Sequence, residues 1–165
     1  MSTQIIEVDK NDNQIGLKYK DEFFGSEFIH RAAHLILFNS KNEILLQLRA
    51  STKKLYPDVF TFSVDATVDD ETYEECITRE VQEELGIVVD AKRLFTFPLF
   101  DDVDRAWHCV FVGASDDDIT PDTREIQSIK WMKSDKLKND IIKNPDKYTP
   151  AFVEGMKKYF NEFDT

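Results

Sequence analysis

The chain has 165 residues and a mass of 19.2 kDa, and 41% of its residues are hydrophobic. This is enough for a single domain, 1–165, with a sizeable core. The net charge of −11 argues against a nucleic-acid polymer or an anionic membrane as a partner, because both attract positively charged proteins. No apolar run approaches the ~20 residues of a membrane span. The start of the chain also lacks the pattern of a signal peptide, so we expect a cytoplasmic protein.

The N-terminal segment, residues 1–27, predicts a hairpin extension. Ile5, Ile6 and Val8 precede a polar turn, and a second apolar run follows at 15–19.

The centre of the chain predicts strands. Residues 30–38 (HRAAHLILF) and 43–49 (EILLQLR) are expected to form a buried antiparallel hairpin. Residues 59–64 (VFTFSV) predict one further strand. Later strands are expected at 93–100, 106–113 and 126–132, followed by helices at 134–142 and 150–160. This order indicates an α/β (α+β) protein with a mixed sheet.

The clearest helix is predicted at 72–85. Thr72 and Glu75 have the spacing of a capping box. Apolar residues then recur every three or four positions, and Gly86 is placed to end the helix.

Three carboxylates, Glu80, Glu83 and Glu84, lie at i, i+3 and i+4 on this helix. At ~100° per residue they share one face, where like charges repel. A solvated acidic face is one interpretation of this cluster. A site for a hard cation such as Mg²⁺ or Mn²⁺ is the other.

From Glu71 onward the chain reads ETYEECITREVQEELGI. This stretch resembles the Nudix box, G-x5-E-x7-R-E-U-x-E-E-x-G-U, in which U is a bulky apolar residue. Aligned over 65–87, eight of the nine specified positions match, and Asp65 stands where the pattern has its leading Gly. Over roughly 28–160 the chain is also similar to the branch that contains isopentenyl-diphosphate isomerase. The resemblance implies a Nudix-type α/β/α sandwich with a catalytic helix.

The resemblance also implies a metal-dependent hydrolase. Its substrate would be a nucleoside diphosphate derivative or another organic pyrophosphate, and its cofactor Mg²⁺ or Mn²⁺. Arg79 would orient the glutamates and Glu71 would brace Arg79, while Glu80 or a loop carboxylate would orient or deprotonate water. The implied catalytic set is Arg79, Glu80, Glu84 and Glu71. The implied metal ligands are Glu80, Glu83, Glu84 and Asp65.

Other polar residues have two interpretations each. Arg49, Lys53 and Lys54 could bind phosphate oxygens or form a solubilising basic turn. The residues that could supply a distal acid or base, but are expected to be ordinary loop carboxylates, are Asp101, Asp102, Asp104 and Glu125. His30 aligns with a metal-binding His of the isomerases but is expected to be structural, since its partner ligands are missing. His34 is expected to be a core or hairpin-edge residue. His108 could line the substrate pocket, although core packing is favoured.

Two alternatives to a hydrolase remain. Asp65 in place of Gly favours a module that binds a phosphorylated ligand without cleaving it, whereas the intact glutamate set opposes this. An isomerase is disfavoured, because its catalytic Cys would align with Asp65, and Cys76 lies on the apolar helix face. The oligomeric state is left open, with a homodimer as one option.

Overall fold

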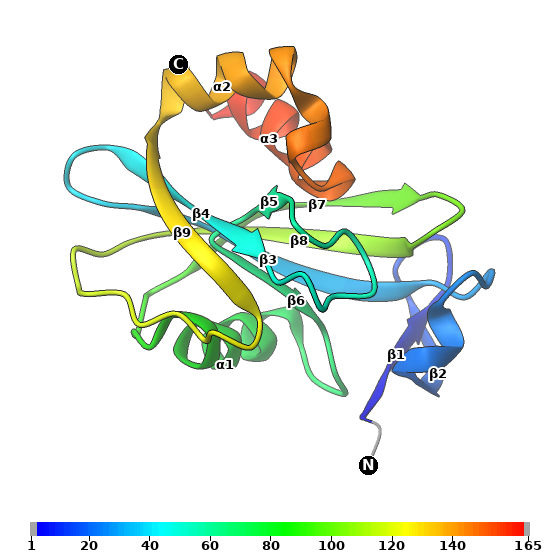
Figure 1. Cartoon of the computed structure of the whole chain (residues 1–165). Coiled ribbons are helices and arrows are strands. Elements are labelled where there is room, and N and C mark those ends of the chain that lie inside the picture. The colour runs from blue at the N-terminus through cyan, green and yellow to red at the C-terminus, as the bar shows by residue number, and fades with distance from the viewer. Residues whose placement is uncertain (1–2, 164–165) are drawn as a thin grey trace.

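A computed structural model describes residues 3–163. In this range a seven-stranded mixed sheet lies between α1 on one face and the pair α2 and α3 on the other (Figure 1). The elements of the central sheet and its helices are β3 (His30–Phe38), β4 (Glu43–Arg49), β5 (Phe60–Thr61), β6 (Val64–Thr67), α1 (Tyr73–Leu85), β7 (Lys92–Phe100), β8 (Arg105–Ala114), β9 (Ile126–Lys133), α2 (Ser134–Lys143) and α3 (Pro150–Glu162). The predicted α/β/α sandwich is therefore confirmed.

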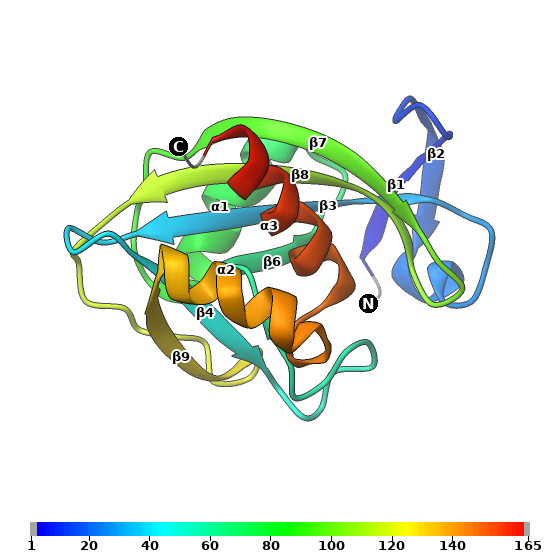
Figure 2. The ribbon, with the colours of Figure 1, turned by 90° about the horizontal axis from the view of Figure 1, so that it is seen from above.

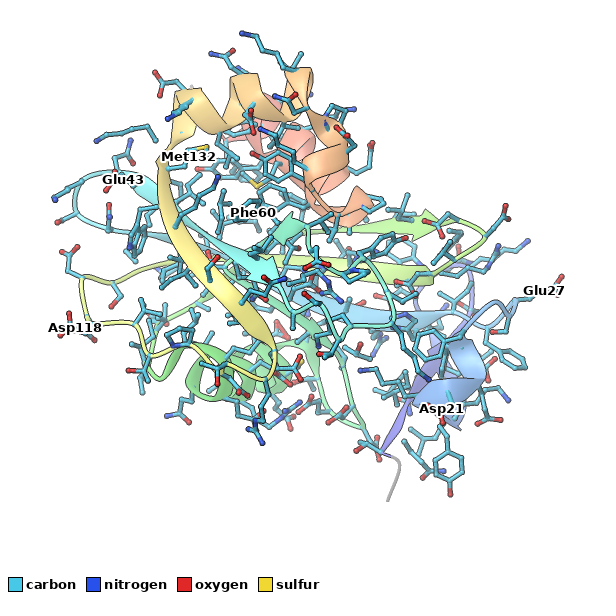
Figure 3. All side chains as sticks on the ribbon, viewed as in Figure 1. Asp21, Glu27, Glu43, Phe60, Asp118 and Met132 are labelled. Carbon is cyan, nitrogen blue, oxygen red and sulfur yellow. The ribbon has the colours of Figure 1, made fainter. Side chains whose placement is uncertain are left out.

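Two apolar layers hold the sandwich together. Because side chains alternate along a strand, Leu35 and Leu37 of β3 pack toward α1, whereas Ile36 packs toward α2 and α3. Figure 2 shows α2 and α3 lying across the strands from above, with α1 behind the sheet. Figure 3 shows the side chains that fill the space beneath them, including Phe60.

The helix expected at 72–85 is confirmed with its caps. The Thr72 hydroxyl accepts a hydrogen bond from the Glu75 backbone N–H at 3.0 Å. Gly86 adopts a left-handed conformation with φ of 70°, which glycine allows without strain.

Two strand predictions are wrong in detail. The strand expected at 59–64 is divided into β5, which pairs with β4, and β6, which pairs with β3. Likewise, β3 and β4 pair only at Phe38 and Ile44, beside their turn. Beyond it they diverge, because β3 pairs in parallel with β8 while β4 pairs with β9. Both the division of the 59–64 segment and the divergence of β3 from β4 thus follow from pairing with strands that are distant in the sequence.

The N-terminal extension forms the predicted hairpin, β1 (Gln4–Val8) and β2 (Gln14–Tyr19). A short 3-10 helix, η1 (Lys20–Phe23), follows it, and another, η2 (Pro145–Lys147), precedes α3. Isolated bridges join Ile5 to Asp69 and Val8 to Ile29, so the hairpin packs against the sandwich. No helix of the described residues is long and apolar enough to cross a membrane.

Candidate active site

The glutamates of α1 occupy three different environments. Glu84 is 5% exposed, whereas the side chains of Glu80 and Glu83 are 18% and 56% exposed. Glu84 therefore lies beneath the helix, against the sheet. There, the Gln47 side-chain amide donates to Glu84 Oε1 at 2.9 Å and to the Ser63 carbonyl at 3.0 Å. The helical face predicted to be acidic is thus exposed to solvent at Glu83 and buried at Glu84.

Burial places this carboxylate in an unfavourable electrostatic environment. Desolvation raises the pKa of Glu84 well above its ordinary value, and the nearby charges of Glu80 and Asp65 raise it further, against the Gln47 hydrogen bond. Desolvation also raises the pKa of Glu80, although Arg79 partly offsets it. Two adjacent, partly desolvated carboxylates form a donor set of the kind that hard divalent cations prefer. In residues 3–163, no three Asp, Glu, His or Cys groups converge closely enough to enclose a cation on their own.

Arg79 connects several acidic residues of the sequence motif. Its Nη2 donates to Glu71 Oε1 at 2.6 Å, and its Nη1 donates to Glu80 at 2.8 Å and to Glu83 at 3.0 Å. Asp69 accepts a further hydrogen bond at 3.3 Å. One guanidinium thus holds Glu80 and Glu83 of α1 and the loop before the helix in a fixed arrangement.

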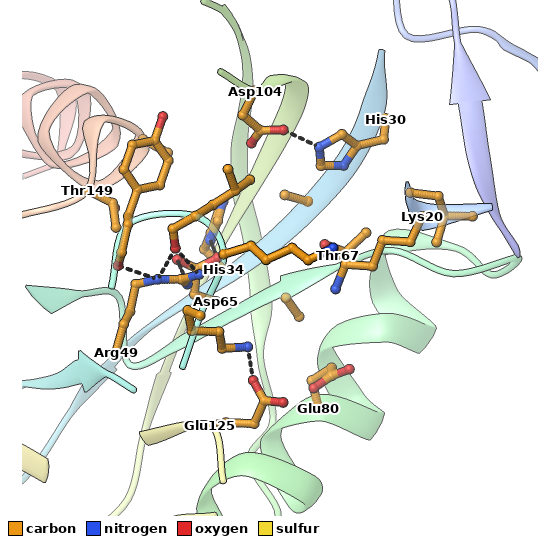
Figure 4. A pocket seen from close by; sticks show the side chains of 18 of the residues that line it. Lys20, His30, His34, Arg49, Asp65, Thr67, Glu80, Asp104, Glu125 and Thr149 are labelled. Carbon is orange, nitrogen blue, oxygen red and sulfur yellow. Dashed lines mark hydrogen bonds and ion pairs between the residues drawn. The ribbon is translucent and has the colours of Figure 1, made fainter. Parts of the chain in front are cut away.

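A cavity of about 670 Å³ opens over these carboxylates. This volume lies within the usual range of small-molecule sites. Figure 4 shows Glu80 on one side of it, with Lys20 and Arg49 reaching in from other elements. The basic residues in its lining are Lys20, Arg49, Lys53, Lys54 and Arg124. Acidic and basic groups therefore face the same space, as binding of a metal-associated phosphate requires.

The structure brings the three basic residues predicted to bind phosphate into this cavity. Arg49 donates to the carbonyls of Leu55 and Tyr56 at 2.9 and 3.0 Å, which fixes the loop 50–59. Lys53 forms an ion pair with Glu125. Burial lowers the pKa of Lys53, and the charge of Arg49 lowers it further. Lys20, which sequence reasoning missed, also lines the cavity, but its segment carries no motif that would have identified it.

Asp65, at the position of the expected Gly, has an ordinary strand conformation within β6 rather than a left-handed one. Its Oδ2 accepts from the Thr61 hydroxyl at 2.7 Å and from Arg49 at 3.4 Å, while its Oδ1 lies 3.4 Å from His34 Nδ1. Burial alone would raise the pKa of Asp65, but the charges of His34 and Arg49 outweigh it and hold the pKa below its ordinary value. The substitution of Gly therefore adds an anchored carboxylate without backbone strain.

The histidines form a polar wall of the cavity. His30, His34 and His108 all line it, although a structural or core role was favoured for each from the sequence. His30 Nε2 lies 2.6 Å from Asp104, and His34 Nε2 lies 2.8 Å from His108 Nδ1. Burial, together with the charge of His34, lowers the pKa of His108 to about 3, so this imidazole is neutral near pH 7.

The loop carboxylates expected to be ordinary fall into two groups. Asp104 pairs with His30, and Glu125 pairs with Lys53, so both are part of the cavity lining. Asp101 accepts from backbone N–H groups of its own loop and lies outside that lining, as does Asp102. Cys76 is buried in the core, as predicted.

Comparison with known proteins identifies relatives of the whole chain. The NUDIX domain model matches residues 28–152. A prenyl-diphosphate phosphatase of Methanosarcina mazei is 43% identical over 162 residues, which cover 96% of this chain and 95% of that protein. An isopentenyl-diphosphate Delta-isomerase of Aromatoleum aromaticum is 31% identical, over 90% of this chain and 88% of its own. A solved structure from Deinococcus radiodurans superimposes with a TM-score of 0.80 at 22% identity, over 94% of this chain and 98% of that one, which shows a shared fold.

Proposed function

Since this chain belongs to the Nudix family and is a hydrolase of organic diphosphates, we propose that its substrate is a prenyl diphosphate and its cofactor Mg²⁺ or Mn²⁺. The observation that carries this proposal is the pair of adjacent carboxylates, the buried Glu84 and the half-buried Glu80, which line the same cavity as the basic residues. The substrate class is supported by the prenyl-diphosphate phosphatase that matches nearly the whole chain.

We assign the metal to the glutamates of α1. Glu80, Glu83 and Glu84 would hold it, because their oxygens are hard ligands and because Glu84 otherwise remains a desolvated charge. When bound, a divalent cation neutralises diphosphate charge and lowers the pKa of water. Asp65 lines the same cavity and is assigned as an additional acidic group there.

The remaining groups bind and orient the substrate. Arg49, Lys53 and Lys54 donate to the phosphate oxygens. Glu80 accepts the proton of the attacking water. The oxygen of this water bonds to phosphorus as the P–O bond to the leaving group breaks. Arg79, held by Glu71, is a positioning residue that keeps Glu80 in place.

An isomerase is not supported by the geometry. Residue 65 is an aspartate, and the two cysteines, Cys76 and Cys109, are both 0% exposed within the core between α1 and the sheet. No thiol of the described residues lines the cavity. A module that only binds its ligand would not need the desolvated glutamates, which lower the stability of the fold.

The test is a substrate panel. Release of phosphate and pyrophosphate is measured with dimethylallyl diphosphate, geranyl diphosphate, nucleotide sugars and nucleoside triphosphates, with Mg²⁺ or Mn²⁺, and products are identified by phosphorus NMR. The proposal predicts the highest kcat/KM with a prenyl diphosphate. Turnover confined to nucleotides would overturn the proposed substrate class.

A further inference from the structure

Much of the apolar part of the cavity lining comes from the N-terminal extension. The large apolar side chains in the lining are Ile5, Phe23, Phe24, Leu55 and Tyr56. The first three belong to the N-terminal extension and lie outside residues 28–152, which the family model matches. The glutamates of α1 lie inside that range. The acidic residues of α1 thus come from the family domain, whereas the extension supplies much of the apolar wall together with Lys20 and Asp21.

Phe23, the last residue of η1, and Phe24, directly after the helix, lie in different environments. Phe23 is 5% exposed, and its ring packs edge-on against His30, with 5.3 Å between centroids. Its backbone carbonyl accepts a hydrogen bond from the Ser26 hydroxyl at 3.1 Å. Phe24 follows directly and is only partly buried. Phe23 is therefore an anchor, whereas the Phe24 ring remains accessible at the cavity.

Phe24 reaches from the extension to the loop 50–59, which also lines the cavity. The Nζ of Lys54, an exposed residue, lies 5.1 Å from the centroid of the Phe24 ring. Leu55, the next residue of that loop, is in the same lining. Phe24 thus lies at the rim of the cavity, where an elongated organic group would pass it.

The extension that carries Phe24 is held firmly against the domain. Asp12 accepts from Arg31 Nε at 2.6 Å and from the Tyr73 hydroxyl at 2.9 Å. Ile5 is 1% exposed and bridges to Asp69, in the loop before α1. A wall fixed before binding loses little conformational entropy when a ligand packs on it, so it can discriminate ligands by size.

We propose that Phe24 is a specificity-determining residue, which packs against the hydrocarbon group of the organic diphosphate and limits its length. This inference rests on the proposed function, since it concerns the organic group of that substrate. One methylene in an apolar pocket changes selectivity by about 10- to 200-fold. A change in the size of the side chain at position 24 should therefore change the ratio of kcat/KM for long and short chains by at least about tenfold.

The test compares two opposite substitutions with a control. Phe24→Ala widens the rim and Phe24→Trp narrows it. Tyr19→Ala is the matched control, because Tyr19 immediately precedes η1, is 50% exposed and lies outside the cavity lining of the described residues. For each protein, kcat/KM is measured with prenyl diphosphates of one, two and three isoprene units. Calorimetry measures the affinity of non-hydrolysable methylene-bridged analogues of the same lengths, and melting curves check folding.

The proposal predicts opposite shifts. Relative to the wild type, Phe24→Ala should raise the ratio of long-chain to short-chain kcat/KM about tenfold or more, Phe24→Trp should lower it, and Tyr19→Ala should leave it unchanged. If the wild type cleaves prenyl diphosphates but neither variant shifts the ratio, the role of Phe24 is overturned while the proposed function stands. If the wild type cleaves none, the proposed function fails. If, in that case, the analogue affinities are also the same in the wild type and the Phe24 variants, this inference is overturned as well.

Discussion

The side-chain amide of Gln47, on β4, donates a hydrogen bond at 2.9 Å to the buried carboxylate of Glu84, on α1. This contact joins the central sheet to the helix that carries the acidic residues. It provides the buried oxygen with a neutral donor, and no cationic side chain within residues 3–163 forms an ion pair with this carboxylate. A bound divalent cation would supply a cationic partner, so the contact positions a ligand without competing for its charge.

Gln47 should therefore control the affinity for metal. Removing the amide in Gln47→Ala leaves Glu84 Oε1 without its donor and frees the carboxylate to rotate. Loss of such a supporting hydrogen bond typically costs about 10- to 100-fold in metal affinity. The measurement is the rise of the melting temperature with added Mg²⁺ or Mn²⁺. Gln82→Ala, at an exposed position on the same helix, is the control. Equal metal responses in wild type and Gln47→Ala would contradict the assignment.

The buried charge of Glu84 should destabilise the metal-free protein near neutral pH. Because the pKa of Glu84 is higher in the folded state than in the unfolded state, the folded state binds more protons between the two values. Stability therefore falls as the pH rises through that range. In a buffer with chelator, Glu84→Gln should melt at a higher temperature than the wild type at pH 7, and the difference should shrink below the ordinary glutamate pKa. Glu154→Gln, at an exposed position on α3, should show no such trend. A lower melting temperature for Glu84→Gln at pH 7 would refute this account.

Asp65 should stabilise the fold, although its position in the motif belongs to Gly. Asp65→Gly removes the acceptor of the Thr61 hydroxyl and the countercharge near His34, both of which are buried. Thr61 keeps Thr149 as a partner and His34 keeps His108, but a lost hydrogen bond to a charged group costs about 1.5–3 kcal/mol. Urea unfolding should show a loss of that size, with a smaller loss for Asp65→Asn, which keeps an oxygen acceptor. A Gly variant as stable as the wild type would show that these contacts contribute nothing.

Arg79 should position the carboxylates through the several N–H donors of its planar guanidinium. In Arg79→Lys the positive charge remains, but one ammonium cannot reproduce the separate hydrogen bonds to Glu71, Glu80 and Glu83. We expect kcat to fall by about 10- to 100-fold while the melting temperature changes little. Arg93→Lys is the matched control, since Arg93 pairs with the exposed Glu74 at 2.9 Å. If both variants keep full activity, Arg79 has no positioning role.

Local sequence signals predicted those parts of the molecule that depend on neighbouring residues. The Thr72 cap, the apolar stripe and Gly86 predicted α1 to within a residue at each end. The resemblance to the Nudix box also implied that Glu71 braces Arg79, and the two side chains are in contact at 2.6 Å.

The parts that sequence could not predict depend on pairing between distant strands. His34 and His108 are 74 residues apart and meet because β3 and β8 run in parallel with Ala32 opposite His108 and His34 opposite Val110. The same pairing brings His30 toward Asp104. Gln47 had one signal, a polar residue within the apolar run EILLQLR, but its partner on α1 could not be identified without the fold.

The most direct test of the account is the hydrolysis of dimethylallyl diphosphate by the wild type and by Glu84→Gln, each with Mg²⁺ or Mn²⁺. The variant keeps a carbonyl oxygen for the Gln47 amide, so its fold should be intact, which circular dichroism checks. We predict metal-dependent phosphate release by the wild type and a loss of kcat/KM of about 100-fold or more in the variant. Equal turnover by a folded Glu84→Gln protein would contradict the assignment of the active site to the carboxylates of α1.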